Sequence, residues 1–417
     1  MAYEESVQKA IASTYDDIWL VAGQRTPFAD YNSVLRDVSP TDLGIFAARA
    51  LFERSGVPAR EVDAIVGGNV AQASFDTYYL PRHIGLYSGV NPSVPALLVQ
   101  RLCGTGFETI IAAADQIALG KAKVALCVGT ESMSRNPIAA YTHRAGFRMG
   151  QLDFRDFLWE ATKDTASSTS MGDTAENLAR QYGISREEVD RFAAQSFARA
   201  VESWQSGWFA GEVTPVVNAK WELDGYNARS LKLADRAESF ERDGHVRQTS
   251  YEALQKLKPA FGGVQTGGNS SAIVDGAAAL IVADGDWVRA NGVKPLARIV
   301  AGAVVAVPPE IMGIGPAPAI RAATQIAGLT VGDLGRIEIN EAFGAQYLAC
   351  EKELGLDRDK SNVHGGAIAI GHPLGASGVR LTTTVARELQ EAGLQYGVSS
   401  ACAGGGQGVA IIVENVT

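Results

Sequence analysis

Short apolar segments alternate with amphipathic ones along the first part of the chain, and this alternation is typical of an α/β fold. Residues 17–22, 62–66 and 124–128 are short runs rich in Val, Ile and Leu, which indicate strands. Residues 41–55 and 106–119 repeat apolar positions at helical spacing, which predicts helices that bury one face. We therefore expect an α/β architecture with a largely parallel sheet.

The same pattern returns in the last third of the chain at a constant offset of 272 residues. Three pairs of segments match at this offset without gaps: residues 56–62 with 328–334, residues 102–106 with 374–378, and residues 124–130 with 396–402. Each half is too long for a solenoid unit. We infer two homologous α/β halves, residues 17–130 (completed by about residues 274–294) and residues 295–417.

Residues 131–273 differ from both halves because they are richer in charged and polar side chains. Within them, Ser185 and Glu188 form a capping box that predicts a helix running through Val201. We expect an inserted loop domain, which would emerge beside the carboxyl ends of the strands, where α/β folds bind ligands. Residues 1–16 form an N-terminal extension to which the pattern assigns no role.

Composition and charge exclude several classes of protein. Hydrophobic residues make up 46% of the chain, which excludes a disordered protein. The net charge is −9 and no run of five Lys or Arg occurs, so we expect no nucleic-acid partner. Residues 392–413 are uncharged but contain six glycines, so they predict no membrane helix. The first 17 residues lack the features of a signal or transit peptide, and we expect a soluble, cytoplasmic protein.

The four cysteines and five histidines show no metal-binding spacing such as CxxC, HxxxH or HExxH. We therefore expect neither a disulfide framework nor a metal site. Cys127 lies inside an apolar strand and Cys350 inside a helix, which is typical of core residues. His364 has no setting that suggests chemistry.

Two cysteines have settings that could support catalysis. Cys103 lies between an apolar stretch and a Gly-Thr-Gly turn that opens a helix, where the helix dipole and free N–H groups would lower the pKa of a thiol. The alternative is a small buried residue at a tight turn. Cys402 precedes a glycine run that includes Gly404, whose backbone N–H groups could receive an oxyanion. The alternative is a glycine turn that joins two core strands.

Two polar residues lie close to glycine-rich or strand-end positions. His372 lies in the glycine-rich segment 365–378, and Pro373 favours an extended backbone at His372. A neutral imidazole presented from such a loop could accept the proton of a thiol, although a lone core histidine is the usual alternative. Asn340 ends the apolar strand 337–339, where it could hold a water molecule or a carbonyl group.

Glycine patterning also raises the possibility of a dinucleotide site. The Gly-x-Gly pairs at residues 104–106 and 313–315 do not complete the GxGxxG pattern. Neither pair is followed by an identified acidic ligand for a ribose. The sequence therefore disfavours dinucleotide binding.

Taken together, the segments that carry these residues resemble the thiolase family, from about residue 17 to the C-terminus. The resemblance rests on residues 24–28, 99–106, 171–177, 266–276, 340–343, 365–378 and 402–406. It implies a thiolase fold, in which two like α/β halves form a five-layered αβαβα core with a loop domain. It also implies a homodimer or homotetramer, no prosthetic group, and coenzyme A (CoA) as co-substrate.

The resemblance implies specific catalytic roles. Cys103 would be the acylated nucleophile, His372 its general base, and Cys402 the group that moves a proton at the acetyl carbon. Asn340 would hold a water that forms one oxyanion hole with His372. The backbone N–H groups of Cys103 and Gly404 would form the other. We expect the surroundings of Cys402 to bring the pKa of its thiol near neutrality.

The resemblance also implies contacts to CoA, although less specifically. Ser271, Met171, Phe261 and Phe343 match family positions that line the tunnel for the pantetheine arm. Arg247 matches a family position near the adenine and phosphate end.

The implied reaction is CoA-dependent thiolytic cleavage of a 3-oxoacyl-CoA to acetyl-CoA and a shortened acyl-CoA, together with the reverse Claisen condensation. Residues 308–316 and 403–408 are most similar to mitochondrial-type 3-oxoacyl-CoA thiolases, which favours medium-chain substrates. An acetyl-CoA C-acetyltransferase specific for acetoacetyl-CoA is the first alternative. A condensing enzyme for carrier-bound thioesters and an inactive CoA-binding subunit are more remote. Departures from the family pattern leave the acyl specificity open: Gln100, Thr105, Ser170, Gly267 and Ser270.

Overall fold

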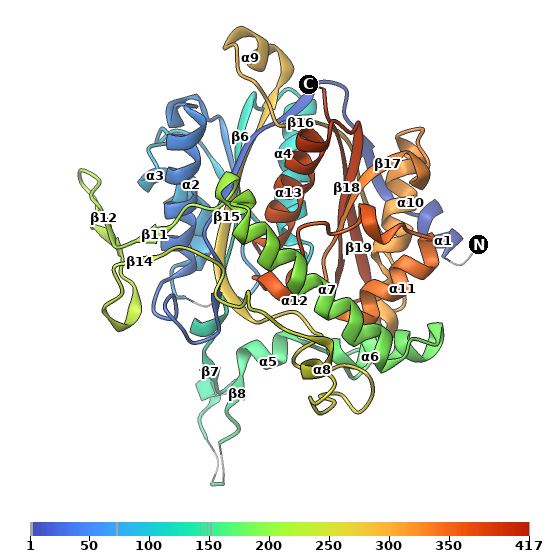
Figure 1. Ribbon diagram of the computed structural model, residues 1–417. Helices are drawn as coiled ribbons and strands as arrows, with labels where there is room; N and C mark the ends of the chain where they lie inside the picture. Colours follow the sequence, from blue (N-terminus) through green and yellow to red (C-terminus); the bar gives the residue numbers. More distant parts are fainter. Residues whose placement is uncertain (1–2, 72–73, 142, 148, 151, 417) are drawn as a thin grey trace.

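A computed structural model describes residues 3–71, 74–141, 143–147, 149–150 and 152–416. One mixed sheet of 11 strands runs through the molecule in the order β17-β18-β19-β16-β2-β15-β6-β4-β5, with β1 on β16 and β3 on β15 (Figure 1). The strands are β1 Ile11–Thr14, β2 Ile18–Arg25, β3 Ala29–Asp30, β4 Ala64–Gly68, β5 Ala96–Val99, β6 Val124–Ser132, β15 Val274–Asp284, β16 Ala297–Ala306, β17 Leu334–Ile339, β18 Tyr396–Ala403 and β19 Gln407–Glu414.

The internal repeat is confirmed by the strand pairing. In the N-terminal half, β4 pairs parallel with β6, and β6 pairs antiparallel with β15. In the C-terminal half, β17 pairs parallel with β18, and β18 pairs antiparallel with β19. The two halves of the sheet join where only Trp19 and Leu20 of β2 pair with Arg298 and Ala297 of β16. The sheet thus consists of two similar halves that join through one short strand pairing.

The expectation of a largely parallel sheet is wrong. In the 11-stranded sheet, β4–β5, β4–β6 and β17–β18 are parallel, whereas the remaining described pairs are antiparallel. One cause is the tight turn between β18 and β19, in which Gly405 and Gly406 adopt φ of 75° and 79°. Such a short connection joins antiparallel strands, whereas parallel strands need a long crossover.

Helices complete the five layers that the resemblance implied (Figure 1). The outer helices α2 and α3 cover the N-terminal half of the sheet, α4 and α13 lie between the halves, and α10 packs on the far side of the C-terminal half with α11 beside it. The α-helices are α1 Glu4–Gln8, α2 Pro40–Ser55, α3 Leu80–Tyr87, α4 Thr105–Ala118, α5 Phe157–Ala161, α6 Met171–Tyr182, α7 Arg186–Gln205, α8 Tyr251–Leu254, α9 Gly285–Ala290, α10 Pro316–Ile326, α11 Gly344–Leu354, α12 Ala367–Ile370 and α13 Ser377–Ala392.

Local sequence signals explain where several helices begin and end. The Ser39 side chain caps α2, Pro40 opens it, and Gly56 ends it at φ 70°. The predicted Ser185–Glu188 capping box is present, and α7 continues past Val201 to Gln205. The helices α4 and α13 begin 272 residues apart, as the repeat requires.

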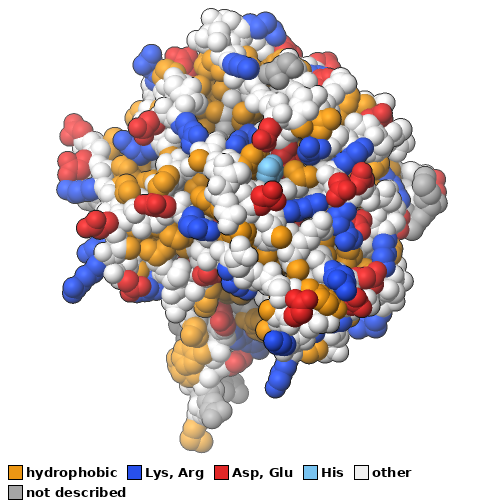
Figure 2. Space-filling model, viewed as in Figure 1, with side chains coloured by type: hydrophobic (Ala, Val, Ile, Leu, Met, Phe, Trp, Pro, Cys, Tyr) orange, Lys and Arg blue, Asp and Glu red, His pale blue; other side chains and the backbone are white. Residues whose placement is uncertain are grey.

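Residues 131–273 contain helices, including the 20-residue α7, and two-stranded sheets rather than another large sheet. Their strands are β7 Ile138–Ala139, β8 Arg155–Asp156, β9 Lys163–Asp164, β10 Thr169–Ser170, β11 Val216–Val217, β12 Ala219–Trp221, β13 Arg229–Leu231 and β14 Ser239–Phe240. The hairpin β7–β8 projects from the body, and apolar side chains gather on it, including the exposed Ile138 and Phe154 (Figure 2). The predicted limits of this insertion stay a prediction.

The N-terminal extension takes part in the fold. Its strand β1 pairs antiparallel with β16, and its helix α1 contacts α10. Among the described residues, no helix combines the length and apolarity needed to cross a membrane.

Candidate active site

Seven of the predicted site residues line one cavity of about 280 Å³. They come from distant parts of the chain: Cys103, Met171, Phe261, Ser271, Phe343, His372 and Gly404. Asn340 is buried next to His372, and Cys402 is buried against Met312 and Ala342, which also line the cavity. The fold therefore gathers nine of the ten predicted residues around one space.

Cys103 lies on a strained turn between β5 and α4. Leu102 adopts φ 48°, which is rare for a residue with a side chain, and the Thr105 hydroxyl accepts a hydrogen bond from the N–H of Arg101 at 2.8 Å. A side chain on Gly106 would lie 2.7 Å from the backbone nitrogen of Gly378. The N-terminal turns of α4 and α13 thus touch, and this close crossing brings Cys103 and the loop of His372 together.

The hydrogen bonds of His372 indicate which ring nitrogen carries the proton. Nδ1 lies 2.6 Å from the Ser377 hydroxyl, and that hydroxyl donates to the carbonyl oxygen of Pro373 at 3.1 Å. The Ser377 oxygen is then the acceptor for an Nδ1–H group. Nε2 stays unprotonated, 3.3 Å from Nδ2 of Asn340. His372 is therefore oriented to receive a proton at Nε2.

Burial keeps both Cys103 and His372 neutral. It raises the pKa of the Cys103 thiol to about 11, although the backbone N–H groups of Gly404 and Cys103 act in the opposite direction. It lowers the pKa of His372 to about 3, with a smaller contribution from Arg380. The prediction that the helix N-terminus lowers the pKa of Cys103 is thus wrong for this resting site, because desolvation outweighs the local dipoles.

This pair predicts an unusual pH profile for the alkylation of Cys103 by iodoacetamide. Transfer of the thiol proton to His372 involves no exchange with solvent, and the two charges that it creates stabilise each other in the buried site. Alkylation through this ion pair should therefore vary less than about threefold in rate between about pH 5.5 and pH 8.5. An isolated thiol would react about tenfold faster for each pH unit over this range. Peptide mass spectrometry would follow the labelling, and His372→Ala should restore the steep profile. A tenfold rise per pH unit in the unsubstituted protein would contradict the pairing.

Cys402 and Gly404 are presented together by the hairpin between β18 and β19. Cys402 is fully buried, and burial raises the pKa of its thiol well above the usual value, with a further contribution from Cys103. The expected near-neutral pKa is therefore wrong for this resting site. The Gly404 N–H points at the Cys103 sulfur and lowers the pKa of that thiol. The backbone can thus stabilise negative charge beside Cys103.

Asn340 carries an acceptor that the protein leaves unpaired. Its Oδ1 atom is buried and accepts no hydrogen bond from the described residues. A water molecule would satisfy such an atom. This environment supports the predicted role of Asn340 in holding a water.

Aromatic rings form one wall of the cavity. The rings of Phe261 and Phe343 meet edge to face, with centroids 6.1 Å apart. A side chain on Gly172 would lie 2.4 Å from the Phe261 ring, so only glycine leaves room there. Such a wall suits the apolar stem of a thioester.

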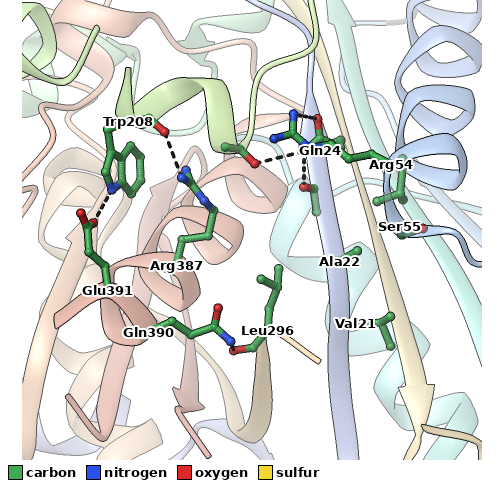
Figure 3. Close-up of a pocket in the computed structure, with 13 residues that line it drawn as sticks. Val21, Ala22, Gln24, Arg54, Ser55, Trp208, Leu296, Arg387, Gln390 and Glu391 are labelled. Carbon is green, nitrogen blue, oxygen red and sulfur yellow. Dashed lines mark hydrogen bonds between the residues drawn. The ribbon is translucent and has the colours of Figure 1, made fainter. Parts of the chain in front are cut away.

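Arg247 lies apart from these residues. It lines a separate cavity of about 350 Å³, where its guanidinium lies 4.8 Å from the Phe197 ring centre and bonds Nε2 of His245 at 2.8 Å. A further cavity of about 490 Å³ lies between β2, α2 and α13 (Figure 3). The predicted site residues do not line it.

Several residues of the site were missed by sequence reasoning. Ser377 orients His372, and its position within the glycine-rich segment was the available signal. No individual role was predicted for other cavity residues, although several lie in segments that carry the resemblance: Leu102, Met133, Trp159, Ile273, Met312 and Leu374. Their place in the cavity depends on the fold.

Two family profiles match the chain. The profile "Thiolase, N-terminal domain" matches residues 18–286, and "Thiolase, C-terminal domain" matches residues 293–415. The chain belongs to the thiolase family. As a thiolase, it is an acyltransferase.

Whole-length relatives agree with this assignment. The thiolase is 44% identical to bovine (Bos taurus) mitochondrial 3-ketoacyl-CoA thiolase over 95% of this chain and 98% of the relative. It superimposes on the crystal structure of human mitochondrial 3-ketoacyl-CoA thiolase in complex with CoA with a TM-score of 0.90 and 43% identity, over 96% and 98% of the two chains. It also matches the Bacillus anthracis acetyl-CoA acetyltransferase structure, with a TM-score of 0.89, 38% identity and coverage of 96% and 99%.

Proposed function

We propose that this thiolase cleaves medium-chain 3-oxoacyl-CoA with free CoA, and catalyses the reverse condensation, through an acyl group on Cys103. The observation that supports it most is the convergence of Cys103, His372, Gly404, Asn340 and Cys402 on one apolar cavity. No prosthetic group enters the proposed reaction, and CoA is a co-substrate.

The first half of the reaction transfers the acyl group to the enzyme. Cys103 gives its proton to Nε2 of His372, and its thiolate attacks the 3-oxo carbonyl. The bond between C2 and C3 then breaks, and its electron pair forms the enolate of acetyl-CoA. The Cys402 thiol protonates C2, which releases acetyl-CoA and leaves an acyl thioester on Cys103.

The second half returns the acyl group to CoA. The Cys402 thiolate takes the proton of the incoming CoA thiol, which attacks the acyl thioester. Cys103 leaves as a thiolate and recovers its proton from His372. Oxyanions form in both halves, and the N–H groups of Cys103 and Gly404, with a water on Asn340, are the donors that we assign to them.

The preference for longer acyl chains rests on the cavity and on the relatives. Besides Cys103, the cavity is lined by apolar side chains such as Met133, Trp159 and Ile273. The bovine relative named for 3-ketoacyl-CoA is 44% identical, whereas the Escherichia coli relative named acetyl-CoA acetyltransferase is 38% identical. An enzyme specific for acetoacetyl-CoA is the alternative.

A thiolysis assay with free CoA separates these two activities. We expect kcat/KM for 3-oxooctanoyl-CoA to equal or exceed that for acetoacetyl-CoA, because each methylene buried in an apolar cavity contributes about 0.8 kcal/mol. The loss of the 3-oxoacyl thioester would be followed for both substrates. Turnover of acetoacetyl-CoA alone would establish the alternative, and tight CoA binding without any turnover would indicate an inactive CoA-binding subunit.

Assembly and location stay predictions. We propose a homodimer or homotetramer in the cytoplasm, although the bovine relative is named as mitochondrial.

A further inference from the structure

A buried ion pair lies directly behind Asn340 and His372. Glu338 and Asn340 are two positions apart at the end of β17, so their side chains face the same side, towards α13. Nη1 of Arg380 on α13 donates to Oε2 of Glu338 at 3.0 Å, and neither side chain is more than 1% exposed. Arg380 lies one helical turn from Ser377, which orients His372. The proposed reaction assigns no role to this pair.

A second carboxyl group faces Glu338. Glu388 lies two turns further along α13, is 2% exposed, and interacts with the Glu338 carboxyl. Both Glu388 oxygens and Oε1 of Glu338 receive no hydrogen bond from an N–H or O–H group of the described residues. Two buried carboxyl groups in this arrangement hold one proton between them. Burial raises the pKa of both carboxyl groups, and Arg380 acts in the opposite direction. The guanidinium of Arg380, which stays protonated, favours the ionised form of the Glu338 carboxyl that it contacts, so the pair carries one negative charge and Glu388 holds the proton.

The other charged groups around Arg380 interact with partners of their own. Glu212 is bound by Arg25 at 2.8 Å and by Arg387 at 3.1 Å. Figure 3 shows Arg387 at the cavity by Trp208, where it also donates to the Trp208 carbonyl oxygen. Glu341 is held by Ser196, Asn362 and the N–H of Ile368, and Arg336 acts on Glu388. The Glu338–Glu388 pair is thus the counter-charge nearest to Arg380 by direct contact.

We propose that Glu338 is a positioning residue for the proton transfer, whose carboxylate balances Arg380 so that His372 can become positively charged beside a buried guanidinium. The proposal rests on the roles of Cys103 and His372 in the proposed function. When Nε2 takes the thiol proton, a cation forms in a region of low dielectric that already holds the Arg380 cation. Without a carboxylate on Arg380, repulsion would disfavour the thiolate–imidazolium state.

Glu388 can replace Glu338 in part as the negative charge that balances Arg380. If Glu338 is made neutral, Arg380 favours release of the shared proton from Glu388. The negative charge then moves further along α13, away from His372. We therefore expect Glu338→Gln alone to be partly compensated, and removal of both carboxyl groups to leave Arg380 unbalanced.

The test compares three variants in the full-length protein: Glu338→Gln, Glu388→Gln and the double substitution. The readouts are the pH-independent rate of Cys103 alkylation by iodoacetamide, and kcat and KM with acetoacetyl-CoA. We expect Glu388→Gln to lie within about twofold of the unsubstituted protein, Glu338→Gln to be about fivefold slower, and the double variant about fiftyfold slower. KM should stay within about twofold in each, since none of these side chains lines the substrate cavity.

Two further variants separate electrostatics from packing. Glu338→Asp keeps the charge and should retain the alkylation rate within about threefold. Glu338→Gln combined with Arg380→Gln removes both charges of the ion pair. Its alkylation rate should equal or exceed that of Glu338→Gln alone. This variant replaces the double carboxyl variant if that protein does not fold. The proposal would be overturned if the loss of alkylation rate in the double carboxyl variant did not exceed the product of the losses in the two single variants. It would also be overturned if Glu338→Gln and Glu388→Gln lowered the rate equally. If Cys103→Ala leaves turnover intact, the proposed function fails instead, so the two failures are distinct.

Discussion

Replacing Cys103 with alanine is expected to lower kcat for thiolysis by at least about 10⁴-fold, because the covalent route through an acyl thioester disappears. The remaining sulfur atoms cannot substitute for it. Cys127, Cys350 and Cys402 are each fully buried, and of these Cys402 alone lies next to the cavity. The substitution should leave the fold intact, since Cys103 is only half-buried and its sulfur fills no core position.

The measurement pairs steady-state thiolysis of acetoacetyl-CoA with intact-protein mass spectrometry after mixing with acetyl-CoA. The unsubstituted protein should gain one acetyl group, and Cys103→Ala none. Cys127→Ala is the matched control, because it removes a thiol of the buried strand β6 that does not line the cavity. Turnover by Cys103→Ala within tenfold of the unsubstituted protein would exclude an acyl-cysteine route.

The internal repeat in the sequence predicted most of the fold. An offset visible in three short segments predicted that α4 and α13 occupy equivalent positions, and their N-terminal turns do meet beside Cys103 and His372. Strand direction was not predictable in the same way, because an apolar run reads alike in parallel and antiparallel pairs. The glycine run after Cys402 shows the difficulty. It is both the tight turn that joins β18 to β19 and a source of the N–H group directed at Cys103.

The protonation states of the site residues were harder to predict from the sequence than the identity of those residues. Spacing and glycine content identified Cys103, His372 and Cys402, but the pKa values depend on burial, which a sequence does not display. The polar residues of α13 illustrate the same limit. Ser377, Arg380 and Glu388 resemble the solvent-facing side of an amphipathic helix in the sequence, yet the second half of the sheet covers them. Glu338 on β17, the partner of Arg380 and Glu388, is therefore identified only in the folded chain.

Replacing Cys402 with alanine is expected to separate the two kinds of chemistry at this site. Cleavage of the C2–C3 bond should slow by at least about 10³-fold, because the enolate carbon loses its proton donor. Acetylation of Cys103 by acetyl-CoA is the reverse of the second half-reaction and also uses Cys402. Its rate should nevertheless stay within about tenfold, because CoA leaves readily as a thiolate at an ordinary thiol pKa of about 8.5.

The two rates would be measured on one preparation, as thiolysis of acetoacetyl-CoA and as single-turnover acetylation followed by mass spectrometry. Cys402→Ser is the matched variant. Its hydroxyl keeps a donor of similar size at the end of β18, but the hydroxyl proton is far less acidic than that of a thiol. The cleavage rate of Cys402→Ser should therefore lie between those of the unsubstituted protein and Cys402→Ala. Because Cys402 is fully buried beside Met312 and Ala342, the alanine variant also removes volume, which thermal unfolding would register. Equal losses in cleavage and acetylation would assign Cys402 a role in shaping the site, whereas a loss confined to cleavage assigns it the proton at carbon.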